Sequence, residues 1–370
     1  MFNLTSMWAI HAGSEDTESD MKKTRIAVAG AGYIGLEHIR VVRESATCVL
    51  SAVVDPSDAA AHIAAKAHVP HYRSLGELFR QDRPDGVVLA TPNTLHLEHA
   101  RLSMQAGVPM LLEKPIASTV DEAEALVADA DRYGASVLIG HHRAHSPIMA
   151  RAKAIIDEGR LGSIVAVMGS AMFFKPDEYF EDAPWRKEPG AGPILLNMIH
   201  DIHNLRMLCG DIVAVQAFSS NATRGYAVED TVAVNLRFGN GALGTFLLSD
   251  TAASARSWEQ TSQENKAYAS YADEDCYVIA GTFGSLSIPT MRLKTYGKPE
   301  DRSWWKPFDV GVEAVMRDDP LKYQMEHFGQ VVRGEAKPIV TARDGLQNLR
   351  ITEAVVMAAK TGAVVETTPV

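Results

Sequence analysis

The feature that most constrains the fold of this chain is a glycine-rich turn between an apolar run and a helical pattern. The run Ile26–Ala29 leads directly into Gly30-Ala31-Gly32-Tyr33-Ile34-Gly35, which is a G-x-G-x-x-G pattern. The first glycine of such a pattern makes a tight turn, the second lets a pyrophosphate approach the backbone, and the third lets the helix pack on the strand. The N–H groups at the helix start then bind the anion. We therefore expect a dinucleotide to contact Gly30, Gly32, Tyr33, Ile34 and Gly35.

An aspartate at the end of the next apolar run indicates which dinucleotide fits. Asp55 follows the run Val49–Val54 and stands 20 residues beyond Gly35. A carboxylate at this point can bind both ribose hydroxyls of NAD, and its charge repels the 2′-phosphate of NADP. We predict NAD as the cofactor. NADP stays an alternative, because neighbouring residues can offset the repulsion.

The first part of the chain has the pattern of repeated strand–helix–strand units. Short apolar runs alternate with helical patterns, and beyond the two runs above they are Gly86–Ala90, Met110–Leu112 and Val137–Ile139. Continuous apolar runs indicate strands that are covered on both faces. We expect an α/β fold whose N-terminal domain, residues 22–145, is a Rossmann domain with a doubly wound parallel sheet.

The sequence pattern changes after Ser146-Pro147. These two residues suit the N-cap and the first residue of a helix. Strand-like segments then follow one another at Ile164–Phe173, Val213–Phe218, Thr231–Phe238, Ala242–Leu248 and Tyr277–Ile279. Two helical stretches, Leu321–Val332 and Leu346–Lys360, close the chain. We expect residues 146–370 to form an α+β domain with a large, mostly antiparallel, open-faced sheet that binds substrate. An open sheet needs a cover, so we expect a homodimer or homotetramer to form through it.

Composition excludes several classes of partner. The chain of 370 residues has a formal net charge of −10 and no Lys/Arg stripe interleaved with aromatics, so we expect no nucleic-acid partner. No apolar run approaches the ~20 residues of a membrane-spanning helix, so we expect no membrane partner.

The cysteines and the first residues suggest a cellular location. Cys48, Cys209 and Cys276 are odd in number, far apart and in apolar settings, which favours buried thiols in a reducing compartment. Residues 1–21 lack the cationic start and unbroken apolar stretch of a signal peptide, and we expect a disordered tail or an over-long start. We predict a cytoplasmic protein.

Two further motifs give the chain a resemblance to a known family. Ala90-Thr91-Pro92-Asn93 with His96 follows one strand, and Glu113-Lys114-Pro115 follows the next. Together with the glycine turn they resemble the Gfo/Idh/MocA family of oxidoreductases. The likeness covers nearly everything after Met21 and extends to Trp185-Arg186, Gly190-Ala191-Gly192, Gly281-Thr282-Phe283-Gly284 and Asp344-Gly345-Leu346. It implies a nicotinamide-dependent enzyme with Thr91, Asn93, His96, Glu113 and Lys114 beside the cofactor.

Lys114 is the first candidate catalytic residue. It lies at the carboxyl edge of the predicted parallel sheet, where open α/β folds bind ligands. A lysine that is partly desolvated near nicotinamide can have a lowered pKa and exchange a proton with a substrate hydroxyl. The resemblance implies the same role, that of the catalytic acid/base.

The second candidate is His200, on a predicted helix from Leu195 to Leu208. Asn197, His200 and Asn204 recur at helical spacing on one face, which we expect to line a cleft, and Met198, Ile202 and Leu205 form the apolar face. His200 resembles the family's catalytic histidine, which positions the reacting oxygen. The family commonly has Asp four residues before this histidine, where this chain has Leu196. Asn197 is a candidate for the missing polar contact.

A histidine-rich segment, Gly140-His141-His142-Arg143-Ala144-His145, follows the run Val137–Ile139. His142 and Arg143 are expected to face the substrate, and Arg186 is a plausible wall residue. The imidazoles of this segment, together with His200 and His203, also suggest zinc. Their spacing matches no standard zinc motif and no cysteine joins them, so we expect no metal.

These residues predict the reversible oxidation of a secondary alcohol on a small molecule, a sugar, inositol or similar cyclic polyol. Lys114 would take the hydroxyl proton, His200 would steer the oxygen, and the hydride would pass to nicotinamide. One alternative is a dehydrogenase of cyclic diols or carboxylated rings, which Lys114, Arg143, Arg186 and His200 would also suit. The other is a non-catalytic nucleotide sensor on the same fold.

Overall fold

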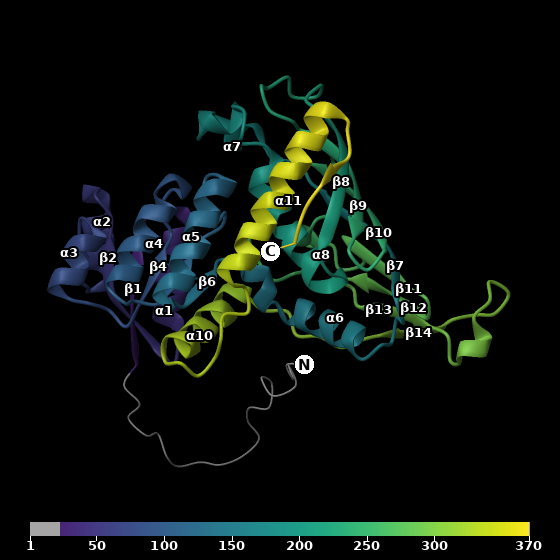
Figure 1. Cartoon of the computed structure of the whole chain (residues 1–370), viewed down its shortest axis with the longest axis horizontal. Coiled ribbons are helices and arrows are strands. Elements are labelled where there is room, and N and C mark those ends of the chain that lie inside the picture. The colour runs from purple at the N-terminus through teal and green to yellow at the C-terminus, as the bar shows by residue number, and fades with distance from the viewer. Residues whose placement is uncertain (1–22, 370) are drawn as a thin grey trace, which may run out of the picture.

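The computed structural model describes residues 23–369, so the prediction for residues 1–21 lies outside it. The chain is built on two sheets that lie side by side, with a long helix between them (Figure 1). The first sheet contains β1 (Thr24–Ala29), β2 (Cys48–Val54), β3 (His71–Tyr72), β4 (Gly86–Leu89), β5 (Met110–Leu112) and β6 (Val137–Ile139). Its order is β3-β2-β1-β4-β5-β6 and every pair is parallel, as the apolar runs predicted. Only the two-residue strand β3 escaped prediction.

Five helices flank this sheet: α1 (Tyr33–Glu44), α2 (Asp58–Ala67), α3 (Leu75–Gln81), α4 (His96–Gln105) and α5 (Val120–Tyr133). Their starts follow from local side chains. The hydroxyls of Ser74 and Thr119 accept hydrogen bonds from the N–H groups of Glu77 and Glu122. Such a cap stabilises a helix by about 1 kcal/mol.

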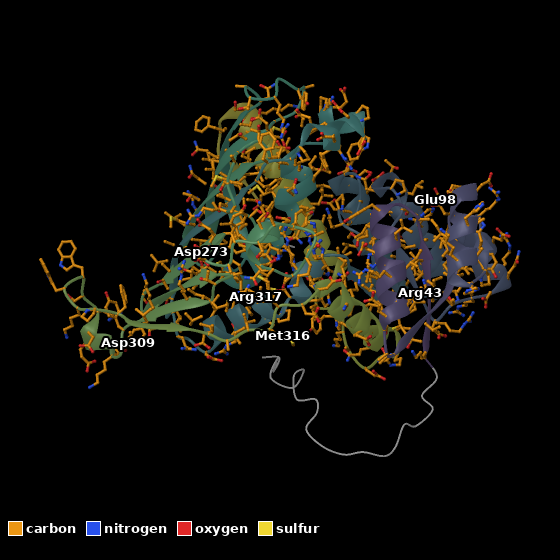
Figure 2. All side chains as sticks on the ribbon, turned by 180° about the vertical axis from the view of Figure 1, so that it is seen from behind. Arg43, Glu98, Asp273, Asp309, Met316 and Arg317 are labelled. Atoms are coloured by element: carbon orange, nitrogen blue, oxygen red, sulfur yellow. The ribbon has the colours of Figure 1, made fainter. Side chains whose placement is uncertain are left out.

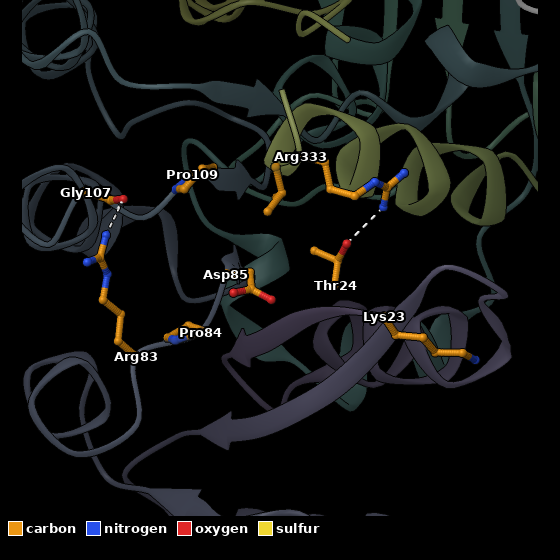
Figure 3. A pocket seen from close by; sticks show the side chains of 9 residues that line it. Lys23, Thr24, Arg83, Pro84, Asp85, Gly107, Pro109 and Arg333 are labelled. Carbon is orange, nitrogen blue, oxygen red and sulfur yellow. Dashed lines mark hydrogen bonds between the residues drawn. The ribbon is translucent and has the colours of Figure 1, made fainter. Parts of the chain in front are cut away.

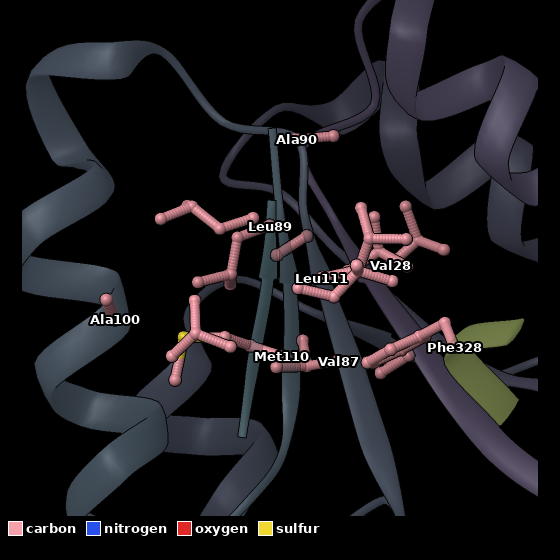
Figure 4. Packing of buried hydrophobic residues seen from close by; sticks show 14 of the residues in the cluster. Val28, Val87, Leu89, Ala90, Ala100, Met110, Leu111 and Phe328 are labelled. Carbon is pink, nitrogen blue, oxygen red and sulfur yellow. The ribbon is translucent and has the colours of Figure 1, made fainter. Parts of the chain in front are cut away.

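The core of the first sheet is made of its own strands and of one helix from the far end of the chain. Val28, Val87, Leu89 and Leu111 are fully buried and pack together with Phe328 (Figure 4). Phe328 lies on α10 (Pro320–Val332), more than 200 residues downstream of β1, β4 and β5. The C-terminal part of the chain therefore completes the core of the N-terminal sheet.

The second sheet has the order β14-β13-β12-β11-β7-β10-β9-β8-β15. Its strands are β7 (Ile164–Met172), β8 (Ile212–Ser220), β9 (Thr231–Phe238), β10 (Leu243–Ser249), β11 (Tyr277–Gly281), β12 (Gly284–Ile288), β13 (Arg292–Thr295), β14 (Asp309–Val312) and β15 (Val365–Glu366). All its pairs are antiparallel except β10 with β7, which confirms a mostly antiparallel sheet. The prediction missed β12 to β15, which are short and rich in polar residues.

Helices cover one face of this sheet. They are α6 (Pro147–Asp157), α8 (Ile199–Cys209) and α11 (Ala342–Thr361), and two short helices, α7 (Asp177–Glu181) and α9 (Trp258–Thr261), lie in the connections. Helix α11 is shared, because Leu346 and Leu349 join the core of the first sheet whereas Ile351 and Val355 join that of the second. The predicted division at residues 145/146 stays a prediction.

The other face of the second sheet is open. Along β9 and β10 buried and exposed residues alternate strictly, as expected for strands with one covered face. Exposed apolar side chains on the open face are Met168, Phe218, Leu243, Leu247, Val310 and Val312. At one end of the sheet β13, β14 and their connection form an arm, and Figure 2 shows its residue Asp309 far from Arg43 and Glu98 of the first domain.

Within residues 23–369, no helix is long and apolar enough to cross a membrane. The three cysteines are buried and unpaired, as the sequence predicted.

Candidate active site

Five of the predicted site segments meet at the carboxyl edge of the first sheet. The glycine turn follows β1, Asp55 follows β2, Thr91 follows β4, Lys114 follows β5 and His142 comes shortly after β6. Because parallel strands end on the same side, these residues gather at one edge, where open α/β sheets bind ligands.

The glycine turn fits a pyrophosphate. Gly30 has φ +93°, and a Cβ there would lie 2.3 Å from the Ala90 carbonyl oxygen. A Cβ on Gly35 would lie 1.9 Å from the Gly30 carbonyl oxygen. By contrast, a Cβ on Gly32, the N-cap of α1, would have nothing within 4 Å, and the first turn of the helix has no side-chain cap and no acidic residue. Bare N–H groups beside open space are what an anion needs.

Asp55 lies against this turn as a carboxylate. Its side chain accepts hydrogen bonds from the N–H groups of Ala31 and Ser57, each at 2.9 Å. Burial alone would raise the pKa of Asp55, but the hydrogen bonds from Ser57 and Ala31 lower it. The charge that would discriminate against a 2′-phosphate is therefore present at neutral pH.

A cavity of about 510 Å³ connects the glycine turn to the histidine-rich segment. Tyr33 and Ile34 line it on the side of the first domain, together with His142 and Arg143. Glu259, on α9 of the second domain, lines it from the other side. The sequence analysis did not single out Glu259, because nothing in its local pattern places it beside a strand end.

Another cavity, of about 640 Å³, lies at the opposite edge of the first sheet (Figure 3). It is lined by Thr24, the first residue of β1, and by Asp85 and Pro109, which lie just before β4 and β5. Arg333 donates a hydrogen bond to Thr24 across it. None of the predicted site residues lies there, so we place the chemistry at the carboxyl edge.

Lys114 reaches from the first domain to the second. Its Nζ donates a hydrogen bond to the carbonyl oxygen of Leu196 at 3.3 Å. Burial lowers the pKa of Lys114, while the nearby Glu113 carboxylate opposes the shift and Arg143 adds to it. A lysine with a lowered pKa is suited to exchange a proton.

The helix that carries His200 differs from the prediction. Instead of one helix from Leu195 to Leu208, Ile194–Met198 forms a π-helical segment, and α8 begins at Ile199. The apolar face of the helix is buried as predicted, but Asn204 is fully buried too and donates a hydrogen bond to the Tyr277 hydroxyl. Asn204 therefore does not line a cleft, because the sheet packs over that turn of the helix.

His200 lies next to two other imidazole rings. Its ring centroid is 5.0 Å from that of His142 and 5.7 Å from that of His141. Burial, and then the charge of Lys114, hold the pKa of His200 well below its ordinary value. The imidazole is neutral at physiological pH. It can therefore donate one hydrogen bond to a substrate oxygen or accept one from a substrate hydroxyl.

Arg143 lines the cavity but is held by two carboxylates, and its predicted contact with a substrate stays a prediction. It is 3% exposed, and its guanidinium contacts Asp201 at 3.0 Å and Glu259 at 2.5 Å. The Tyr277 hydroxyl donates to the same Asp201 oxygen. Burying a guanidinium without partners is costly, so the fold supplies two carboxylates to it. Of its two carboxylate partners, Glu259 lines the cavity.

The side chains of His96 and Glu113 contact other groups of the protein, and neither lines the cavity. The His96 ring nitrogens lie 2.8 and 2.9 Å from the carbonyl oxygens of Pro115 and Thr91, which ties the two strand-end loops together. The Glu113 carboxylate pairs with buried His38 at 2.8 Å and accepts from the Lys114 N–H at 3.2 Å. Their predicted contact with the cofactor stays a prediction, but these side-chain partners favour a positioning role.

The remaining predicted residues are Asn93, Thr91 and Arg186. Asn93 is exposed in a short 3₁₀ turn, Asn93–Leu95, and the Thr91 hydroxyl lies 3.0 Å from a ring nitrogen of His99. The Arg186 guanidinium stacks 3.8 Å over the ring centroid of Tyr179 and donates to the Tyr179 carbonyl.

The imidazoles near the site are divided among separate contacts. His141 stacks on His203 at 4.7 Å, and both contact the Asn348 amide at 3.1 Å. His145 instead pairs with His327 at 2.9 Å. Among the residues that the structure describes, no group of three or more His, Cys, Asp or Glu side chains could hold a metal ion.

Lys175 is a largely buried cation that the sequence analysis did not single out. Lys175 follows β7, and its Nζ donates to Asn197 Oδ1 at 2.8 Å. Asn197 was expected to replace the missing family aspartate toward a ligand, and the structure shows its amide oxygen bound by this lysine. The only local signal for Lys175 was a charge directly after an aromatic strand end.

Comparison with known proteins identifies the family. The profile described as "Oxidoreductase family, NAD-binding Rossmann fold" matches residues 24–141, and that of the "GFO/IDH/MocA C-terminal domain" matches residues 149–287. The chain belongs to the GFO/IDH/MocA family. This oxidoreductase is therefore an NAD(P)-dependent enzyme with an NAD-binding Rossmann domain, as the sequence predicted.

Relatives of this GFO/IDH/MocA enzyme match along almost their whole length. Rhizopine catabolism protein MocA of Rhizobium meliloti is 27% identical over 90% of this chain and 94% of its own. Inositol 2-dehydrogenase of Rhizobium meliloti strain 1021 is 23% identical over 90% of this chain and 96% of its own. The fold is shared with the WlbA dehydrogenase of Bordetella pertussis in complex with NADH and UDP-GlcNAcA, at a TM-score of 0.74 and 22% identity over 94% of this chain and 99% of that one.

Proposed function

We propose that this enzyme oxidises a secondary alcohol of a sugar, inositol or similar cyclic polyol, with Lys114 as the acid/base. The observation that carries the proposal is the Lys114 ammonium, which lies partly buried at the carboxyl edge of the sheet near His200 and donates to one backbone carbonyl. Inositol 2-dehydrogenase among the relatives supports the substrate class.

The residues of the chain divide the work. The neutral Lys114 amine accepts the proton of the substrate hydroxyl, so that the O–H bond breaks as an N–H bond forms. Neutral His200 holds the same oxygen by a hydrogen bond, and Glu113 keeps the lysine backbone in place. Bound NAD would supply the hydride acceptor, held by the glycine turn and Asp55.

The conformation of the site favours catalysis over sensing. A nucleotide sensor needs the glycine turn and Asp55 but no proton-transfer lysine, whereas this chain places a lysine of lowered pKa at the strand end. A cyclic-diol or carboxylated substrate stays the second candidate, and the additional buried ammonium of Lys175 favours an acidic one.

The test combines binding with turnover. Calorimetry should show uptake of NAD, and a panel of inositols, aldoses and sugar acids should include at least one that reduces bound NAD. Uptake of NAD with no reduction by any polyol of the panel would count against the substrate class. Absence of NAD uptake by folded protein would contradict the placement of the cofactor.

A further inference from the structure

Two ammonium groups contact consecutive residues of the π-helical segment. Lys114 Nζ donates to the Leu196 carbonyl at 3.3 Å, and Lys175 Nζ donates to the Asn197 side-chain oxygen at 2.8 Å. Lys114 comes from the first domain and Lys175 from the loop after β7 in the second. Lys175 therefore lies one residue along the same segment from the contact made by the acid/base.

The ammonium of Lys175 is only partly satisfied by the protein. An ammonium has three N–H donors, and among the described residues its one hydrogen bond is that to Asn197. Asp250 Oδ2 forms a longer ion pair with the ammonium at 3.6 Å, and Arg224 donates to the other oxygen of that carboxylate, Oδ1. The Lys175 side chain is only 11% exposed, so little bulk water can compensate. Donors remain for an acceptor that enters the site.

A second cation lies beside the first. Lys175 Nζ is 4.8 Å and the Arg186 guanidinium 3.8 Å from the centroid of the Tyr179 ring. Both are attracted by the negative face of an aromatic ring, which keeps two like charges close together. The two cations would both attract an anionic group that lies near this ring.

The segment between the two lysines carries no competing charge. Ile194–Met198 contains no carboxylate, and position 196 is a leucine. A carboxylate there would pair with a lysine and repel an anionic ligand. With a leucine there, the segment offers the two ammonium groups only a backbone carbonyl and a neutral amide oxygen.

We propose that Lys175 binds a carboxylate of the substrate, so that the enzyme acts on a polyhydroxy acid, a sugar acid or a cyclic polyol that bears a carboxylate. The inference rests on the proposed function, since Lys114 must act on a hydroxyl of the same molecule. Lys175 is the specificity-determining residue and Arg186 supports it.

The electrostatics of Lys175 agree with this role. Burial lowers its pKa to about 8, against the opposing charges of Asp250 and Glu259. A carboxylate bound to the ammonium would compensate for the lost hydration and raise that pKa.

The experiment compares the binding of each acid with that of its neutral twin, the uncharged compound with the same carbon skeleton. Calorimetry on the NAD-loaded enzyme measures the Kd of glucuronate against glucose and of gluconate against glucitol. We expect the acid of at least one pair to bind about tenfold or more tightly than its twin. In Lys175→Met that preference should vanish, with the Kd of the neutral twin and of NAD unchanged. Lys175→Arg should retain part of it, and Lys153→Met, on the outside of α6, should behave as wild type.

The outcomes distinguish the role of Lys175 from the polyol reaction itself. Equal binding of every acid and its twin, or a preference that survives in Lys175→Met, overturns the role of Lys175 and leaves the polyol reaction standing. Binding of NAD without any of the four compounds contradicts this inference and counts against the polyol class as well. If Lys175→Met unfolds at a lower temperature or loses NAD, the Kd values of Lys175→Arg decide.

Discussion

The Lys114 ammonium donates a hydrogen bond to the main-chain carbonyl of Leu196, 3.3 Å away. One residue follows β5 in the nucleotide-binding domain and the other lies in a π-helical segment of the second domain. π-helical turns recur at functional sites because they displace the backbone from the regular helix. The position of Lys114, the proposed acid/base, thus depends on how the two domains pack.

Replacing Lys114 by Met should abolish proton transfer without affecting the cofactor. Loss of a general acid/base typically lowers kcat by about 10² to 10⁴. Steady-state kinetics on the best polyol of the panel measures that loss, and calorimetry should show an unchanged Kd for NAD. A variant that keeps wild-type kcat would contradict the assignment.

The pH profile of alcohol oxidation should report Lys114. The neutral amine is the active form, so kcat should rise with pH and level off above the lysine's pKa. Burial lowers this pKa below its ordinary value of 10.5, with Glu113 and Glu259 opposing and Arg143 adding to the shift. The inflection is therefore expected below 10.5, and kcat for the reverse reduction should fall over the same range. A profile with no inflection in that direction would argue against Lys114 as the base.

Asp55→Ser should shift cofactor preference from NAD toward NADP. The change removes the carboxylate that bonds to Ala31 and Ser57 and would bind the ribose hydroxyls. Hydrogen bonds to a charged group contribute about 1.5 to 3 kcal/mol, so the Kd for NAD should rise by roughly tenfold to a hundredfold. Calorimetry with both dinucleotides measures the ratio, with Asp157→Ser on α6 as control. An unchanged ratio would exclude Asp55 from cofactor selection.

Arg143→Met should destabilise the fold strongly. The change leaves Asp201 and Glu259 without their buried cation, and breaking such a pair typically costs about 3 to 5 kcal/mol. Denaturant unfolding measures the loss. Arg343→Met, which removes an exposed pair with Asp131, should cost at most about 1 kcal/mol. Similar losses in both variants would mean that the buried network contributes little.

Met168→Glu and Leu243→Glu should lower the mass of the particle in solution. Both side chains lie on the open face of the second sheet and are 60% and 59% exposed in the single chain. We expect another copy to cover this face, and a buried carboxylate would be costly there. Light scattering on the wild type should give a dimer or tetramer, and Tyr133→Glu on α5 should leave that mass unchanged. A monomeric wild type would refute the expectation.

Much of the site could be predicted because its residues follow strand ends in the sequence. The glycine turn and Asp55 stand directly after an apolar run and Lys114 two residues after one, and parallel topology brings such residues to one edge. His200 was found through its helical spacing and the family resemblance. The π-helical start of its helix was not predictable, since apolar periodicity does not distinguish that geometry from an α-helix.

By itself the sequence determined the parallel sheet, the dinucleotide turn and the lysine at its edge, because each depends on residues that are neighbours along the chain. Only the tertiary structure decided the partners of buried charges. Arg143 meets carboxylates 58 and 116 residues away, and Lys175 meets an amide 22 residues away. The physical reason is that a buried charge takes whichever acceptor the packing of distant segments brings within reach, and local patterns carry no record of that packing.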